Sequence, residues 1–146
     1  MRLIDHYLTI MDLSQVNVDR KSTYPLGTWK GERGDMIYLN CEEQIKMLGV
    51  LELRPELGVR GRHAHKTKKE IFYFITGQVT GRYWFEENPD DVREIRHIRG
   101  HLVTIEPGLF HEFLALEPSW AVEFSPQTHN DNDAVYPEKN TINRRS

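Results

Sequence analysis

The sequence has only one cysteine, Cys41, so no disulfide can form within the chain. This scarcity is typical of proteins from a reducing compartment. No apolar run approaches the roughly 20 residues that a membrane-spanning helix needs. The N-terminus also lacks the apolar stretch of a signal peptide, because Asp5 and His6 interrupt it. We therefore expect a cytoplasmic protein that does not act in a membrane.

Neither sign of charge is in large excess, with 19 basic and 22 acidic residues and a net charge of −3. The chain has no stripe of lysine and arginine, which argues against a nucleic-acid partner. Its 146 residues are the length of one domain, so we expect a single domain over residues 1–146. That domain would have a core at about 48–125, an N-terminal arm at 1–40 and a polar C-terminal tail or lid at 126–146.

Helical periodicity is also missing over most of the chain. Short apolar or alternating segments are separated by turn residues, which predicts an all-β sandwich or barrel. The expected strands are residues 48–53, 71–75, 79–85, 93–98, 102–105, 110–116 and 120–124, with a further strand resuming near Gly61. A turn is expected at 86–91. In the less regular N-terminal arm we expect one helical turn at 12–16 and a strand at 35–39.

Three histidines and a glutamate have the spacing of a metal site. His63 and His65 are two apart, so on a strand they project from the same face. Glu70 opens the next strand after a short loop, and His111 opens a later strand just after Pro107 and Gly108. Three imidazoles and one carboxylate suit one divalent transition metal, namely Zn, Mn, Fe or Ni. The plainer alternative is that these are ordinary surface or core residues and that their spacing is a coincidence.

The same residues resemble the two motifs of the cupin family. His63-x-His65, four residues, Glu70, six residues and Gly77 match the first motif, and Gly100, Pro107, Gly108 and His111 match the second. The asparagine that usually follows the second motif is missing, but it is not a metal ligand in the family. The resemblance covers about residues 48–125 and implies a single cupin-type double-stranded β-helix, which is a jelly-roll barrel.

A closer resemblance concerns cupins that act on keto sugars. The stretch Arg60-Gly61-x-His63-x-His65-Lys66 is similar to that of 3,4-ketoisomerases for nucleotide-linked 4-keto-6-deoxy sugars, which often carry Gln at the position of Glu70 and work without a metal. The run from His63 to Glu70 also resembles a zinc-holding cupin that epimerises a keto sugar at the C-terminus of a capsular-polysaccharide reductase. In these relatives a segment comparable to residues 130–136 closes the barrel.

This resemblance implies an isomerase or epimerase acting on a keto sugar or sugar nucleotide. The metal, or His65 as a base, would assist proton removal next to a ketone. The candidate catalytic residues are His63, His65 and Tyr83, and the candidate substrate-binding residues are Arg60, Arg62, Lys66, Phe72 and Phe113. There is also a plainer interpretation, in which these residues have no role in binding. The cations would then lie at a solvated strand end, and the aromatic residues, with Phe74, would belong to the barrel core.

Two other functions use the same ligand set. An Fe(II)-dependent dioxygenase fits three histidines and one glutamate equally well, and a non-catalytic cupin would only bind a small molecule. The family resemblance also implies a homodimer formed through an N-terminal strand containing Tyr7, Leu8 and Ile10, since an open sheet needs its edge covered. We expect His97 and His101 at the surface and His129 in the tail.

Overall fold

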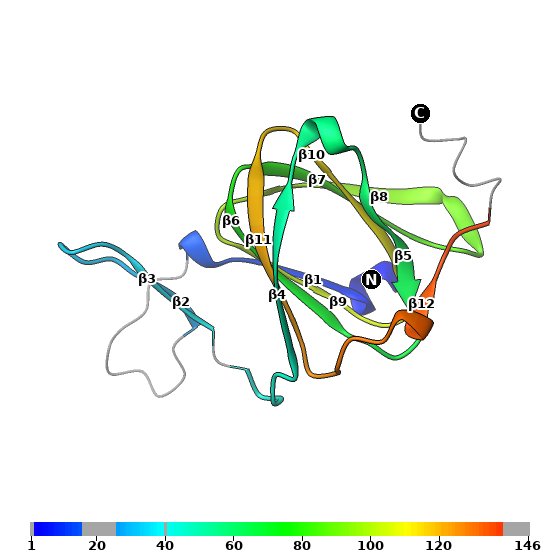
Figure 1. Ribbon diagram of the computed structural model, residues 1–146, viewed down its shortest axis with the longest axis horizontal. Helices are drawn as coiled ribbons and strands as arrows, with labels where there is room; N and C mark the ends of the chain where they lie inside the picture. The colour runs from blue at the N-terminus through cyan, green and yellow to red at the C-terminus, as the bar shows by residue number, and fades with distance from the viewer. Residues whose placement is uncertain (1, 16–25, 40, 139–146) are drawn as a thin grey trace.

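Two antiparallel sheets face each other and form a barrel (Figure 1). The computed structural model describes residues 2–15, 26–39 and 41–138. The first sheet has the order β1-β9-β6-β11-β4, made of Leu8–Asp12, His101–Ile105, Glu70–Thr76, Ser119–Ser125 and Met47–Leu53. The second has the order β12-β5-β10-β7-β8, made of Ala134–Val135, Arg60–His65, Phe110–Ala115, Gln78–Phe85 and Asn88–Ile98. The predicted jelly-roll fold is confirmed.

The core lies between the two sheets because one face of each strand is apolar. On β6 the side chains of Phe72 and Phe74 are buried, whereas Thr76 at its end is exposed. These rings meet Phe113 of β10 in edge-on contacts, with ring centroids 5.0 Å and 5.6 Å apart. Burying a large apolar side chain contributes about 1.5–3 kcal/mol, so this aromatic cluster is a main source of the stability of the barrel.

The expected strands of the barrel are all present, but the turn at 86–91 is shorter than expected. Only Glu86 and Glu87 form the turn, and β8 already begins at Asn88. Pro89 is tolerated in β8 because β8 is the edge strand of its sheet, where a missing N–H breaks no ladder hydrogen bond. The expected helical turn in the arm is a short 3₁₀ helix, Leu13–Gln15, with part of the expected range outside the described residues.

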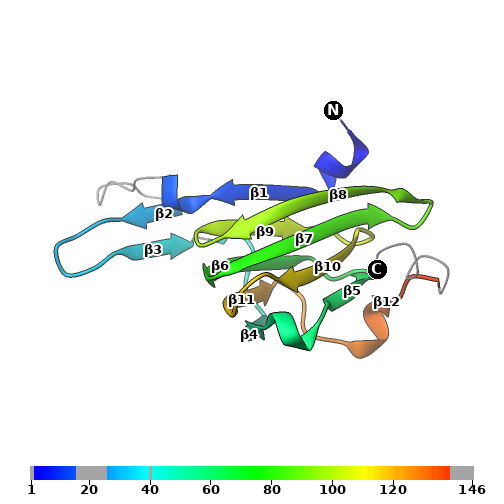
Figure 2. The same ribbon diagram turned by 90° about the horizontal axis from the view of Figure 1, so that it is seen from above.

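The N-terminal strand covers a sheet edge within its own chain. β1 pairs antiparallel with β9, from Leu8 opposite Ile105 to Asp12 opposite His101. In the structure, β1 thus has its partner strand within its own chain. The homodimer stays a prediction. A hairpin of β2 (Leu26–Trp29) and β3 (Met36–Leu39) extends away from the barrel, as Figure 2 shows.

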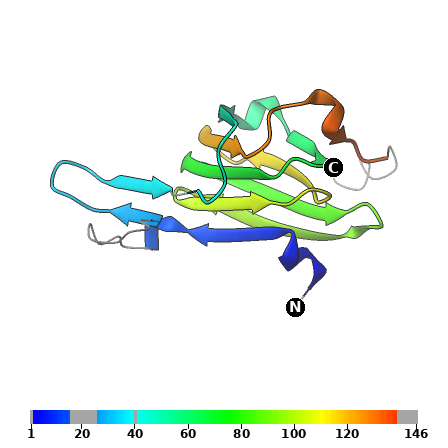
Figure 3. The same cartoon turned by 90° about the horizontal axis from the view of Figure 1, so that it is seen from below.

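The polar tail returns to the barrel and adds a strand to it. A 3₁₀ helix, Asp131–Asp133, leads into β12, which pairs with β5 so that Ala134 lies opposite His65 (Figure 3). Two further 3₁₀ helices, Leu3–His6 and Pro55–Leu57, flank β1 and β5. None of the helical segments in the described ranges has the length and hydropathy needed to span a bilayer.

Candidate active site

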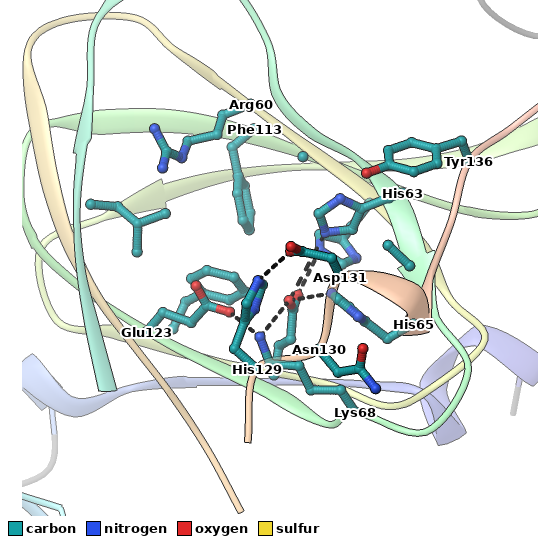
Figure 4. A pocket seen from close by; sticks show the side chains of 16 residues that line it. Arg60, His63, His65, Lys68, Phe113, Glu123, His129, Asn130, Asp131 and Tyr136 are labelled. Carbon is teal, nitrogen blue, oxygen red and sulfur yellow. Dashed lines mark hydrogen bonds and ion pairs between the residues drawn. The ribbon is translucent and has the colours of Figure 1, made fainter. Parts of the chain in front are cut away.

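A cavity of about 180 Å³ opens beside β5 and the returning C-terminal segment (Figure 4). Seven of the residues predicted for the site line it, namely Arg60, His63, His65, Glu70, Phe72, His111 and Phe113. Three predicted residues, Arg62, Lys66 and Tyr83, do not.

Three strands from the two sheets bring His63, Glu70 and His111 together. His63 on β5 and His111 on β10 are register partners, and Glu70 is the first residue of β6 in the opposite sheet. The Nε2 atom of His111 lies 2.8 Å from Glu70 Oε2, and Nε2 of His63 lies 3.9 Å from Glu70 Oε1. One ligand atom from each of the three residues lies within 4.8 Å of the other two. This is the spacing of atoms that share one cation.

His65 was predicted as a fourth metal ligand, but it is not in this group of three and instead contacts two carboxylates. Its Nε2 atom lies 2.7 Å from Glu70 Oε1, and its Nδ1 atom lies 3.3 Å from Asp133 Oδ2. Asp133 is fixed in turn by the loop between β5 and β6, because its carboxylate accepts hydrogen bonds from the backbone N–H groups of Thr67 and Lys68 and from the Thr67 hydroxyl. The C-terminal segment is thereby anchored next to the imidazole of His65.

Burial and mutual charge set the ionisation of these groups. Burial, reinforced by the neighbouring His111, lowers the pKa of His63 to about 4, so its imidazole is neutral at neutral pH. Burial opposes ionisation of Glu70, but the imidazoles of His111 and His65 outweigh it and hold the pKa of the carboxyl well below its usual range. Burial likewise opposes a charge on His111, but Glu70 outweighs it and raises the pKa of that imidazole.

The donor atoms of the cluster fit a divalent metal. Buried polar atoms normally have hydrogen-bond partners. Within the described part of the chain, however, both ring nitrogens of His65 and Oε2 of Glu70 are buried without an aligned hydrogen bond, although other site atoms lie at contact distance. Imidazole nitrogen and carboxylate oxygen, which the cluster offers, suit Zn, Mn, Fe or Ni.

Arg62 and Lys66 were predicted to bind substrate, but the structure turns both away from the cavity. Arg62 has a φ of 60° at the point where the register between β5 and β10 shifts, and its Nε donates to Glu112 Oε2 at 2.7 Å. Lys66 is exposed in the loop after β5, where its backbone N–H donates to the carbonyl of Asp133. For Lys66 the plainer interpretation, a solvated strand end, describes what is observed, whereas Arg62 is half-buried in an ion pair.

Tyr83 was predicted to be catalytic, but it lies beneath the cavity in the core. Its side chain has no exposed surface, and its hydroxyl is 2.5 Å from Nε2 of His97. His97 was expected at the surface, and this was wrong. It is fully buried and stacks on Phe74 with ring centroids 4.9 Å apart, and its Nδ1 lies 3.2 Å from Nδ1 of the half-buried His101.

Several lining residues were missed by the sequence analysis. Lys68 and Glu123 form one wall, and His129, Asp131 and Tyr136 stand at the mouth. His129 had been assigned to a plain tail. For Glu123 a signal existed, since it shares strand parity with the buried Ala121. For the mouth residues the only signal was the loose likeness of residues 130–136 to a closing segment.

Comparisons with known proteins add a fold likeness. No protein-family profile matches the sequence, and no curated protein is detectably similar to it in sequence. The structure is similar to a 3,4-ketoisomerase from Helicobacter canadensis, with a TM-score of 0.71 and 14% identity over 94% of this chain and 96% of that one. It is also similar to a sugar 3,4-ketoisomerase from Thermoanaerobacterium thermosaccharolyticum in complex with TDP, with a TM-score of 0.72 and 13% identity over 95% and 94%.

An epimerase is among the similar structures too. The dTDP-4-dehydrorhamnose 3,5-epimerase from Bacillus anthracis, with TDP and pyrophosphate bound, gives a TM-score of 0.61 and 13% identity over 75% of this chain and 73% of that one. At such identities the likeness concerns the fold and leaves the chemistry to be argued from the site. The chain therefore has the barrel fold of the cupin-type sugar-nucleotide ketoisomerases and epimerases.

Proposed function

We propose that this protein is an isomerase or epimerase that moves a proton next to the ketone of a keto-sugar nucleotide. The observation that carries the proposal is the cavity itself, in which the cluster of His63, Glu70 and His111 adjoins His65. Behind the cavity lining, His65 pairs with Asp133. The fold likeness supports the substrate class, since similar ketoisomerase structures hold TDP and TDP-4-keto-6-deoxyglucose.

The cavity would hold only one part of such a substrate. A space of about 180 Å³ is small beside a whole nucleotide sugar, so we place the sugar ring in it. The nucleotide part would then lie outside, against the residues at the mouth. Tyr136 offers an exposed aromatic face there, and Arg60 in the cavity lining offers a guanidinium for phosphate oxygens. Of the predicted cations, Arg60 alone keeps its proposed role, since Arg62 pairs with Glu112 and Lys66 lies outside.

In the reaction that we propose, His65 takes the proton from the carbon next to the ketone. The C–H electron pair forms a carbon–carbon double bond, and the carbonyl π electrons move onto the ketone oxygen, which gives an enediolate. Asp133, 3.3 Å from Nδ1, stabilises the imidazolium that forms. Return of the proton to the neighbouring carbon, with proton exchange between the two oxygens, moves the ketone by one position. Return to the same carbon from the other face inverts it.

A divalent metal held by His63, Glu70 and His111 would supply a positive charge that stabilises the enediolate oxygen. Residues of the chain make this site suitable for a metal ion. Burial keeps His63 neutral at neutral pH and therefore able to donate an electron pair. Phe72 and Phe113 line the cavity beside the cluster, and their apolar rings strengthen electrostatic interactions there.

The test is product formation from a panel of 4-keto-6-deoxy sugar nucleotides, followed by NMR with metal-loaded and with metal-free protein. We expect one panel member to be isomerised or epimerised, and we expect His65→Asn to lower kcat by at least about 100-fold, the lower range for a general base. The matched control is His6→Asn, which changes an exposed histidine that does not line the cavity. No product across the panel from either form would contradict the proposal.

The two alternative functions give different results in the same preparation. Oxygen uptake that requires Fe(II) and disappears in His63→Ala would favour the dioxygenase. Tight binding of a sugar nucleotide without turnover or proton exchange would favour the binding protein. The cytoplasmic location and the homodimer are carried forward as predictions of the sequence.

A further inference from the structure

Two charged residues in the cavity have no part in the proposed reaction. Lys68 and Glu123 have side-chain exposures of 4% and 16%, and Lys68 Nζ lies 3.1 Å from Glu123 Oε1. The same ammonium lies 3.6 Å from Glu70 Oε1. Lys68 is therefore held between two carboxylates, one of which belongs to the metal cluster and the other of which does not.

Glu123 comes from a different wall than the histidines. It lies on β11, opposite Phe72 of β6 in the strand register, whereas His63 and His65 lie on β5 in the other sheet. In Figure 4 the carboxylate of Glu123 lies on the side of the cavity away from His63 and His65. A ligand ring held between these walls presents one edge to the histidines and another edge to Glu123.

The apolar surroundings of Glu123 raise the free energy of its ionised form. Leu51, Phe72 and Phe113 line the same part of the cavity, and burying a carboxylate among apolar groups costs free energy unless it is paired. Lys68 offsets part of that cost, but burial and the neighbouring carboxylate of Glu70 still raise the pKa of the Glu123 carboxyl. A buried ion pair is on average no more stabilising than well-packed apolar residues of the same volume. A pair that adds little stability and borders a ligand cavity is well placed to bind a ligand.

A fixed carboxylate that faces a cavity is an acceptor for ligand hydroxyl groups. One oxygen of Glu123 accepts from Lys68, which fixes the direction of the carboxylate. A 4-keto-6-deoxy hexose that is linked to a nucleotide at C1 has free hydroxyls only at C2 and C3. If the edge from C3 to C4 faces His65 for the reaction, the hydroxyl at C2 is the one that takes no part in it.

We propose that Glu123, positioned by Lys68, accepts a hydrogen bond from the C2 hydroxyl of the sugar and so selects 2-hydroxy over 2-deoxy substrates. This inference rests on the proposed function, because it presumes that a keto sugar occupies the cavity. It adds a specificity-determining contact on a wall that the histidines do not form. Glu123 acts on binding of the ring and not on the proton that is transferred.

The test is a cycle of two proteins and two substrates. Wild type and Glu123→Gln are assayed with the 4-keto-6-deoxy sugar nucleotide that the wild type converts best and with its 2-deoxy counterpart. A hydrogen bond to a charged group is worth about 1.5–3 kcal/mol. We therefore expect the substitution to lower kcat/KM about 10- to 100-fold for the 2-hydroxy substrate, mostly through KM, and by less than about 3-fold for the 2-deoxy substrate.

Each outcome of the cycle decides a separate point. An equal loss for both substrates would assign Glu123 a structural role and overturn the inference, while turnover by the wild type would leave the proposed function standing. A wild type that converts both substrates equally well would overturn the inference even if the variant fails to fold. A wild type that converts neither substrate would overturn the proposed function and this inference together. Glu117→Gln, an exposed glutamate in the turn before β11, is the control.

Discussion

Asp133 shows how much one buried carboxylate can hold in place. It accepts hydrogen bonds from Thr67 and Lys68, and it lies 3.3 Å from Nδ1 of His65. Burial opposes its ionisation, but the hydrogen bonds from Thr67 and Lys68 outweigh burial and lower the pKa of the carboxyl. Asp133 therefore both anchors the C-terminal segment and orients the imidazole that we assign as the base.

Asp133→Asn tests this orienting role. An amide keeps the size of the side chain but cannot stabilise an imidazolium, so kcat should fall about 10- to 100-fold with little change in KM, as for other groups that orient an active histidine. The pH profile of kcat should also shift, which a purely structural role would not cause. An unchanged kcat and profile would contradict the assignment. Asp35→Asn, an exposed residue outside the cavity, is the control.

His97 gives a prediction about stability and pH. Burial, with a smaller contribution from His101, lowers its pKa to about 3, against about 6.5 in the unfolded chain. Between these values the unfolded state binds a proton that the folded state does not, so stability falls as pH drops below 6.5. The full loss is reached near pH 3, with a slope of up to about 1.4 kcal/mol per pH unit.

Urea titrations from pH 7 to pH 4 on wild type and His97→Gln would measure this dependence. We expect the variant to lose stability less steeply over this interval, because its amide does not titrate. Parallel curves for the two proteins would contradict the assignment of this effect to His97. The cavity residues are unchanged in both proteins, so their contribution to the slope cancels in the comparison.

At the scale of single residues, strand parity predicted which side chains face inward but not how deep they lie. His63 and His111 were placed correctly next to the cavity, and Tyr83, also inward, ended beneath it on His97. Arg62 could not be placed by parity at all, because its positive φ and the register shift after His111 redirect the side chain. Such depth and irregularity depend on contacts between distant strands.

Among the elements, the connection from β6 to β7 depends on a single glycine. Gly77 has a φ of 91°, and a Cβ at this position would lie 1.9 Å from Oγ of Ser119 and 2.8 Å from its Cα. Any side chain would therefore be strained and would push β11 away. We expect Gly77→Ala to lower the free energy of unfolding by about 2–4 kcal/mol, the sum of backbone strain and overpacking.

Gly49→Ala is the matched control for this substitution. Gly49 lies on β4, and a Cβ there would meet nothing within 4 Å. We expect its effect to stay within about 0.5 kcal/mol, the usual range for open positions. Equal destabilisation by both substitutions in urea unfolding would contradict the account of Gly77.

The C-terminal segment is the element that the sequence predicted least well. Its residues 130–136 are polar and have no period, and β12 contains only two residues. Long-range contacts hold this segment in place, chiefly those of Asp133 with the loop after β5. The strands of the barrel, by contrast, are short apolar or alternating segments separated by turn residues. These patterns are local in the sequence, and for that reason the strands could be predicted.

On the scale of the whole molecule, the cluster that we propose as a metal site exists only when the barrel is assembled. His63 and His111 come from one sheet and Glu70 from the other, so the unfolded chain has no preformed site. Metal binding should therefore stabilise the fold. We expect about one equivalent of metal per chain by mass spectrometry of protein purified without a tag or chelator, and a higher Tm after metal addition.

The double substitution of His63→Ala and His111→Ala should abolish both effects. A folded wild type without metal that also takes up none on titration would contradict the cluster as a metal site and would leave metal-free proton transfer by His65. Sedimentation of the same samples would test the predicted homodimer, which no contact within a single chain decides.

The central claim is that this cavity removes a proton next to a ketone, and proton exchange with solvent tests it most directly. The protein would be incubated in D₂O with TDP-4-keto-6-deoxyglucose, and deuterium at the carbons beside the ketone would be followed by NMR. The account predicts incorporation that depends on the amount of wild-type protein and is lost in His65→Asn. No incorporation above the protein-free rate with this and related 4-keto sugar nucleotides, or equal incorporation by the variant, would contradict it.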